Sequence, residues 1–115
     1  MTTPFTAVLD TLTRLRGVRA SLVVAAADGI AIDSNLQIGQ DGSRVAALAA
    51  SLYRKARKSA AAAGFGGTGF MQLEAEQGRL CLLGGDEVVL VVVTQRDANV
   101  GLIRVEMLKA AETLA

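Results

Sequence analysis

Residues 41–64 read DGSRVAALAASLYRKARKSAAAAG, and this stretch decides how the rest of the chain is organised. Asp41 or Ser43 can accept a backbone N–H as the N-cap of a helix. Gly64 suits the left-handed position that follows the end of a helix. The sequence therefore predicts one long helix from Asp41 to Ala63.

The predicted long helix has two different faces when it is projected at about 100° per residue. A core-facing apolar stripe is expected at Val45, Leu48, Ala49, Leu52, Ala56 and Ala63. The other face is expected to carry Ala46, Ala47, Ala50 and Ala61 beside Tyr53, Arg54, Arg57 and Lys58. A solvated face would be richer in Glu, Lys and Gln, whereas alanines spaced by four residues let another backbone approach. We expect this second face, Ala50 included, to pack against a partner.

The length and composition predict a single domain spanning residues 1–115. Hydrophobic residues make up 51% of the chain but aromatic residues only 3%, so the core must consist mainly of Ala, Val, Leu and Ile. The formal net charge of +1 gives no overall attraction to nucleic acid or to an anionic membrane. No stretch reaches the roughly 20 apolar residues of a membrane span, so no membrane insertion is expected. One cysteine excludes an intramolecular disulfide, and the beginning of the chain lacks signal-peptide features, which together predict a cytoplasmic protein.

Two shorter helices and five strands are predicted in the remaining sequence. The first helix is expected to begin with Thr3 as N-cap and Pro4 in the first turn, and to end before Gly17. The last helix is expected to begin after a cap at Asp97 or Asn99. The expected strands are 18–26, 30–34, 70–75, 79–83 and 87–94, and turn signals such as Asp28-Gly29 separate them.

The resulting order, α-β-β-α-β-β-β-α, predicts an α/β fold in which short turns make neighbouring strands antiparallel. We expect a three-layer α/β/α sandwich with a five-stranded, mainly antiparallel sheet. The long helix would cover one face and the two shorter helices the other. The strand 70–75 pairs with certainty only with the strand that follows, so it is expected to be an edge. Its open backbone groups would invite a second copy to pair along Phe70, Met71, Gln72, Leu73 and Glu74.

Catalytic and cofactor chemistry find little support in the sequence. The chain has no histidine, so it lacks the commonest general base and any Ser-His or Cys-His pair. Cys81 lies within an apolar strand and is expected to be a buried thiol, and no metal-ligand spacing is present. The run Gly64-Phe65-Gly66-Gly67-Thr68-Gly69 matches G-x-G-x-x-G, but a helix precedes it and a strand follows it. This order is the reverse of a dinucleotide site. No catalytic, metal-binding or cofactor-binding residue is predicted.

Two surface features each allow a plain and a functional interpretation. Arg54, Lys55, Arg57 and Lys58 could form a solvated face or a surface for an acidic protein partner. Nucleic acid is disfavoured because only Tyr53 is available to stack on bases. In the last helix, Leu102 and Val105 project among polar residues. Packing against the first helix is the favoured explanation, and a binding surface is the alternative.

The element order and several short motifs together resemble the Roadblock family. The motifs are Val18–Ala26 running into Asp28-Gly29-Ile30, Gly78-Arg79-Leu80, and Asp97–Arg104 at the start of the last helix. The likeness extends from the first helix to Ala115. Within the family, the chain is most similar to small bacterial and archaeal members of the MglB type.

This resemblance implies a homodimer in which the long helices lie side by side and the third strands join into one continuous sheet. It also implies a non-enzymatic regulator that binds an MglA-like, Ras-like small GTPase, because MglB-type members stimulate GTP hydrolysis by their partner. The surface that faces the GTPase would lie on the paired long helices, at Ala46, Ala47, Ala50, Tyr53, Arg54 and Arg57. The alternative is a dimeric scaffold that binds partners in either nucleotide state.

Overall fold

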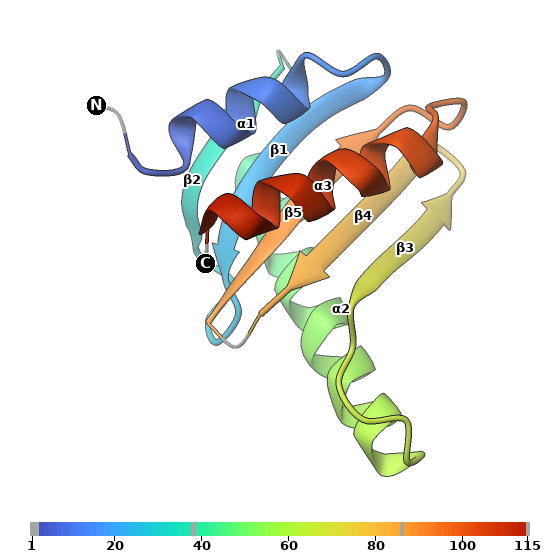
Figure 1. The fold of residues 1–115 in the computed structure, drawn as a ribbon. Helices are drawn as coiled ribbons and strands as arrows, with labels where there is room; N and C mark the ends of the chain where they lie inside the picture. Colours follow the sequence, from blue (N-terminus) through green and yellow to red (C-terminus); the bar gives the residue numbers. More distant parts are fainter. Residues whose placement is uncertain (1–2, 38, 86, 115) are drawn as a thin grey trace.

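The computed structural model of the chain describes residues 3–37, 39–85 and 87–114. The predicted element order is confirmed. The elements are α1 (Thr6–Thr13), β1 (Val18–Ala25), β2 (Ala31–Leu36), α2 (Gly42–Ala62), β3 (Phe70–Ala75), β4 (Gly78–Gly84), β5 (Val88–Thr94) and α3 (Val100–Leu114). Helices α1 and α3 cover one face of the sheet and α2 covers the other, which gives the expected three layers (Figure 1).

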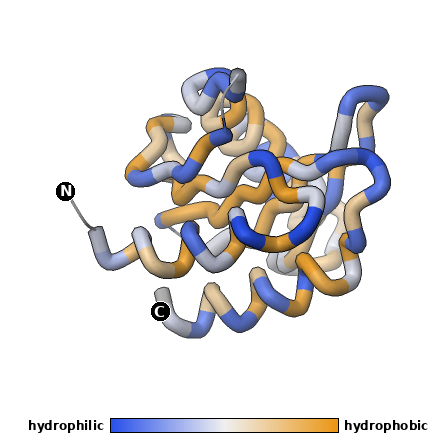
Figure 2. Tube along the Cα trace, turned by 90° about the horizontal axis from the view of Figure 1, so that it is seen from above, coloured by the Kyte–Doolittle hydropathy of each residue, from blue (hydrophilic) through white to orange (hydrophobic). Residues whose placement is uncertain are grey.

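The five strands form one sheet in the order β2-β1-β5-β4-β3, and each neighbouring pair is antiparallel. Side chains alternate between the two faces, so each face has its own apolar core. Leu22, Val91 and Leu82 lie in the core beneath α2. Val23 and Val92 lie in the core beneath α1 and α3. The hydrophobic residues accordingly concentrate in the strands between the helical layers (Figure 2).

The β1–β2 turn forms at Asp28-Gly29, as predicted. The Asp28 carboxylate accepts the Ile30 N–H at 3.0 Å, and Gly29 adopts φ +75°. A Cβ atom at Gly29 would lie 3.4 Å from Cα of Ala47 and from Cβ of Ala50. These are ordinary van der Waals distances, so the positive φ, and not the approach of α2, is the reason that glycine suits this position.

The start of α1 differs from the prediction. The helix begins at Thr6, and Phe5 occupies the N-cap position without a side-chain cap. The Thr3 hydroxyl accepts the Phe5 N–H at 3.1 Å and also donates to the carboxylate of Asp33 on β2. Thr3 and Pro4 thus precede the helix, because the Thr3 side chain ties this segment to the sheet instead of capping α1.

Both ends of α2 follow the predicted chemistry. The Asp41 carboxylate accepts the Arg44 N–H at 3.1 Å and caps the first turn. Gly64 adopts φ +84°, and the N–H groups of Gly64 and Phe65 bond to the carbonyls of Ala61 and Ala60. The second half of α2 extends beyond the sheet (Figure 1). Among the described residues, no helix is long and apolar enough to cross a membrane.

Candidate protein interaction surface

Helix α2 rests on the sheet through a face that the sequence analysis assigned to a partner. Ala46, Ala50 and Tyr53 are 1%, 0% and 2% exposed and lie in the core with Ala49. The assignment of these three residues to an intermolecular face is therefore wrong. Their short side chains let the α2 backbone approach the sheet, and the Tyr53 ring lies against Gly84, where a Cβ atom would overlap it. The Tyr53 hydroxyl also donates to the Gly85 carbonyl at 3.0 Å.

The predicted core stripe of α2 is correspondingly rotated away from the sheet. Of its members, Ala49 is buried as expected, but Leu48 is 52% exposed. Val45 and Leu52 are partly buried along the border of the core. A signal for this orientation was present in the sequence, because Arg44, Ser51 and Lys55 share the side of the helix that carries Leu48.

The other residues predicted for the interaction surface lie on the outside of α2. Ala47, Arg54, Lys58 and Ala61 are exposed, and Arg57 is partly buried. Two of the cations make contacts within the protein, which limits how far they can extend. Arg54 Nη1 donates to the carbonyls of Ala26 at 2.7 Å and Ala27 at 3.3 Å.

Arg57 lies over the ring of Tyr53, and its guanidinium carbon is 5.5 Å from the ring centroid. This cation–π contact joins the outer surface of α2 to its buried face. The contacts of Arg54 fix the middle of α2 to the β1–β2 turn, whereas the contact of Arg57 lies within the helix.

Strand β3 is an edge of the sheet, as predicted. Met71 and Leu73 pair with Leu82 and Leu80, so they face the α2 side. Phe70, Gln72 and Glu74 face the α3 side. Phe70 and Met71 are partly buried, whereas Gln72, Leu73 and Glu74 are exposed.

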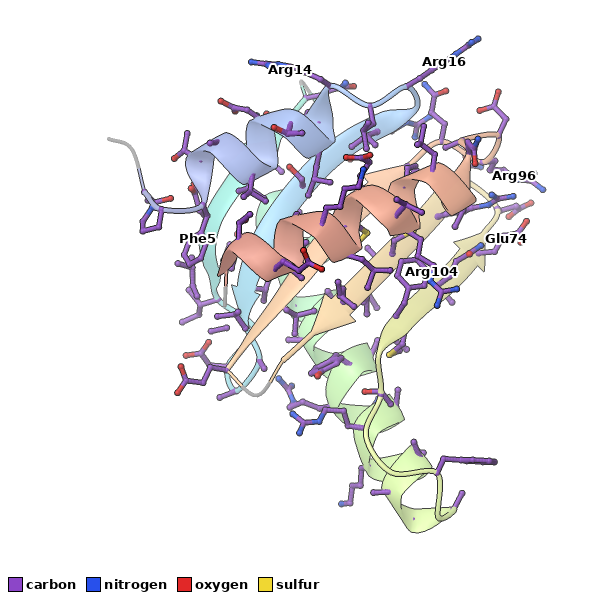
Figure 3. The ribbon with its side chains drawn as sticks, in the orientation of Figure 1. Phe5, Arg14, Arg16, Glu74, Arg96 and Arg104 are labelled. Atoms are coloured by element: carbon purple, nitrogen blue, oxygen red, sulfur yellow. The ribbon has the colours of Figure 1, made fainter. Side chains whose placement is uncertain are left out.

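The α3 side of the β3 edge carries charged contacts (Figure 3). Arg104 of α3 lies over the Phe70 ring, 5.3 Å from its centroid. Glu74 pairs with Arg79 of β4 at 3.6 Å. This side of the edge therefore carries charged side chains beside Phe70, in contrast to the side that faces α2.

An apolar strip on the α2 side of the sheet runs out to the β3 edge without a cover. Val93, Leu80 and Leu73 are paired neighbours across β5, β4 and β3. Leu80 is 7% exposed, but Leu73 is 38% exposed. The reason is that α2 packs on β1, β2, β4 and β5 but makes little contact with β3. We call the residues Leu48, Leu52, Met71 and Leu73 the apolar border.

The opposite edge, β2, is protected from further pairing. Its register with β1 shifts between Val23 and Val24, which leaves Ile32 outside the ladder as a bulge. The Asp33 carboxylate accepts the Ser34 N–H at 2.8 Å and thereby occupies a backbone donor of this strand. Bulges and charged residues are common ways to prevent an edge from pairing with another chain.

Cys81 lies in the interior of the protein. Its thiol is fully buried, and this burial raises its pKa to about 11, although the nearby Arg79 lowers it in part. A thiol in this state is protonated at neutral pH and is a poor nucleophile.

Among the described residues, no group of three or more His, Cys, Asp and Glu could hold a metal ion. Residues 64–69 follow α2 and precede β3, so the glycines meet the end of a helix.

The favoured explanation for Leu102 and Val105 is wrong, because each side chain is 48% exposed. Helix α1 meets a different side of α3, where Val8 and Leu12 lie near Ala110. Leu108 is also 43% exposed, so α3 carries a second group of exposed apolar side chains.

Comparison with known proteins identifies the fold's relatives. The family model described as the Roadblock/LC7 domain matches residues 5–94. The chain belongs to the Roadblock/LC7 family. Uncharacterized protein MJ1340 of Methanocaldococcus jannaschii is 36% identical to this Roadblock/LC7 chain over 107 residues, which cover 93% of each protein.

Two solved MglB structures resemble this Roadblock/LC7 domain closely. Myxococcus xanthus MglB superimposes with a TM-score of 0.86 at 27% identity and covers 97% of this chain and 92% of its own. The gliding protein MglB of Thermus thermophilus gives a TM-score of 0.84 at 20% identity, with coverage of 100% and 90%. The fold class predicted from the sequence is therefore confirmed.

The orientation of α2 yields a prediction about folding. Ala50→Glu would place a carboxylate in the core without a partner, so we expect a loss of about 3 kcal/mol or more in the free energy of unfolding. Ala47→Glu is the matched control on the exposed side of the same helix, with an expected change within about 0.5 kcal/mol. Urea unfolding monitored by circular dichroism measures both. Equal stability of the two variants would contradict the orientation described here.

Proposed function

We propose that this protein is a homodimeric, non-enzymatic regulator that binds a Ras-like small GTPase of the MglA type. The observation that carries the proposal is the overall likeness to Myxococcus xanthus MglB, since the match covers nearly the whole of both chains. The unequal edges of the sheet support the dimer independently. The expected location is the cytoplasm, where such a GTPase would be found.

The second copy joins at β3 in this proposal. The β3–β4 register continues without a shift over six residue pairs, from Phe70↔Leu83 to Ala75↔Gly78. A regular, uncovered edge strand can pair with an identical strand from a second copy, and the two-fold symmetry then makes the contact self-complementary. The protected β2 edge leaves β3 as the favoured edge for such pairing.

The two long helices complete the interface. Pairing at β3 would bring the apolar borders of the two copies together and remove Leu48 and Leu73 from water. The side of α2 that carries Leu52 continues through Ala56, Ala60 and Ala63, of which the first two are partly exposed and the last is exposed. Alanines on this side let a second helix approach closely. The dimer mate therefore meets α2 on the side of Leu52 and Ala56, which leaves Lys55 and Lys58 outside the contact.

The surface for the GTPase remains on the outer side of α2 and beside the β1–β2 turn. Of the residues implied by the resemblance, Ala47, Arg54 and Arg57 are at least partly accessible. Arg54 is bound to two backbone carbonyls, so using it as an inserted arginine finger would break both bonds. We infer that any stimulation of hydrolysis works through the switch residues of the GTPase itself.

The dimer interface is tested with a matched pair of edge substitutions. Leu73 is 38% exposed on β3 and Leu36 is 37% exposed on β2, both on the α2 side of the sheet. We expect Leu73→Glu to raise the dissociation constant of the dimer by more than about tenfold, or about 1.4 kcal/mol, since like charges would face each other.

Light scattering after size-exclusion chromatography measures the mass of each variant in solution. Wild type and Leu36→Glu should have twice the chain mass of 11.9 kDa, and Leu73→Glu should shift toward the monomer. A monomeric wild type, or a dimer lost only in Leu36→Glu, would contradict the proposed interface.

The regulatory role is tested by affinity capture from a lysate of the source organism, once with a non-hydrolysable GTP analogue and once with GDP. We expect mass spectrometry to find a Ras-like GTPase enriched at least about tenfold with the GTP analogue. An Ala47→Arg bait should lose this GTPase by steric and charge conflict, whereas an Arg14→Glu bait on α1 should retain it. Partners recovered equally in both nucleotide states would instead favour the dimeric scaffold, for which the exposed Leu102, Val105 and Leu108 offer a second surface.

A further inference from the structure

Charge is distributed unevenly along the chain. From Gly42 to Leu73 there is no carboxylate, while the cations are Arg44, Arg54, Lys55, Arg57 and Lys58. This leaves seven of the 12 basic residues and all 11 acidic residues for the rest of the chain. Although the net charge is close to zero, the segment that contains α2 is basic and the rest of the protein is acidic.

Most of these cations lie where α2 leaves the sheet. Arg54, Lys55 and Lys58 are exposed, and they are followed by the overhanging last turns of the helix (Figure 1). The bond from Arg54 to Ala26 marks the last point at which the outer side of α2 is tied to the β1–β2 turn. Two acidic residues lie at this base, because Asp28 follows Ala27 in the chain and the Glu87 carbonyl accepts the Ala26 N–H at 2.9 Å. Beyond it lie Lys55 and Lys58, within the segment from Gly42 to Leu73 that contains no Asp or Glu.

An exposed aromatic side chain lies at the tip of this overhang. Phe65 is 83% exposed and is flanked by Gly64 and Gly66. Its backbone is nevertheless fixed, because its N–H bonds to the Ala60 carbonyl at 2.9 Å as part of the helix end. The tip therefore presents a large apolar group in a defined position directly after a basic helix.

We propose that the overhang of α2 docks on the surface of an anionic lipid bilayer. Lys55 and Lys58 lie against the acidic headgroups, and Phe65 enters the interface between headgroups and acyl chains. A combination of cations with an exposed aromatic residue is the composition that peripheral membrane helices use. The contact is superficial and needs no spanning segment.

The shape and the chemistry of the overhang favour lipid over other anionic partners. A single-stranded nucleic acid would require several aromatic rings in succession to stack on its bases, but the overhang offers the single ring of Phe65, and Tyr53 is buried. An acidic peptide would require a groove, whereas this segment protrudes from the protein (Figure 1). A bilayer accepts a protruding tip, because its headgroups rearrange around cations and its interface admits one aromatic ring.

Dimerisation strengthens the contact, and this part of the inference rests on the proposed function. Each cation near an anionic surface strengthens binding about fivefold, and a second overhang on the same assembly adds avidity. Docking itself requires only the overhang. A failure of lipid binding would thus leave the dimer and the GTPase untouched, and those are measured separately.

The test is co-sedimentation with sucrose-loaded vesicles, made either of phosphatidylcholine alone or of equal parts phosphatidylcholine and phosphatidylglycerol. We expect wild type to bind the mixed vesicles, to bind phosphatidylcholine at least about tenfold more weakly, and to be released by salt. Lys55→Glu/Lys58→Glu should weaken binding by more than about 100-fold. Phe65→Ser should weaken it by about tenfold without any change in charge.

The matched control is Arg14→Glu/Arg16→Glu, which makes the same change in net charge at the end of α1 (Figure 3). This variant should bind the mixed vesicles within about threefold of wild type, because its substitutions lie away from the overhang. Light scattering of each variant before the assay confirms an unchanged assembly. Absence of binding by wild type, equal loss in both double variants, or equal binding to both vesicle types would overturn the proposal.

Discussion

The close approach of α2 to the sheet is the constraint on which the rest of the structure depends. Ala46, Ala49 and Ala50 bring the helix backbone near the strands, and Tyr53 fits against Gly84 at the far end of this contact. A helix held in this way can cover only part of the sheet, because its axis leaves the strands before it reaches β3. The uncovered edge, the apolar border and the overhang all follow from this placement.

The two edges of the sheet differ in how readily they can pair with a further strand. At β2, a bulge disturbs the hydrogen-bond ladder, and the Asp33 carboxylate accepts the backbone N–H of Ser34. At β3, the ladder remains regular and apolar side chains continue outward to Leu73. Hydrophobic burial and open backbone groups therefore favour the same edge, β3, for association. The neighbouring helix α2 carries basic residues and no acidic ones after Asp41.

The sequence was sufficient to predict the fold, because turn signals, caps and hydrophobic periodicity are local properties that agreed with one another. Asp41, Gly64 and Asp28-Gly29 act as expected. The orientation of α2 was not predictable by hydrophobicity, which ranks Leu48 above Ala50 as a core residue. What decides the orientation is the fit of Tyr53 against a glycine more than 30 positions away in the chain. The β3 edge was predicted, whereas Ala46, Ala50 and Tyr53 were assigned to an outer face of α2 and lie in the core.

The central claim is that β3 is the strand that meets a second copy, and amide hydrogen exchange measures this most directly. We expect exchange in residues 70–75 to slow as the protein concentration rises through the dissociation constant of the dimer, while residues 31–36 exchange at a constant rate. Slowing at 31–36 instead, or unchanged exchange at 70–75 in a sample whose mass is dimeric, would contradict the account.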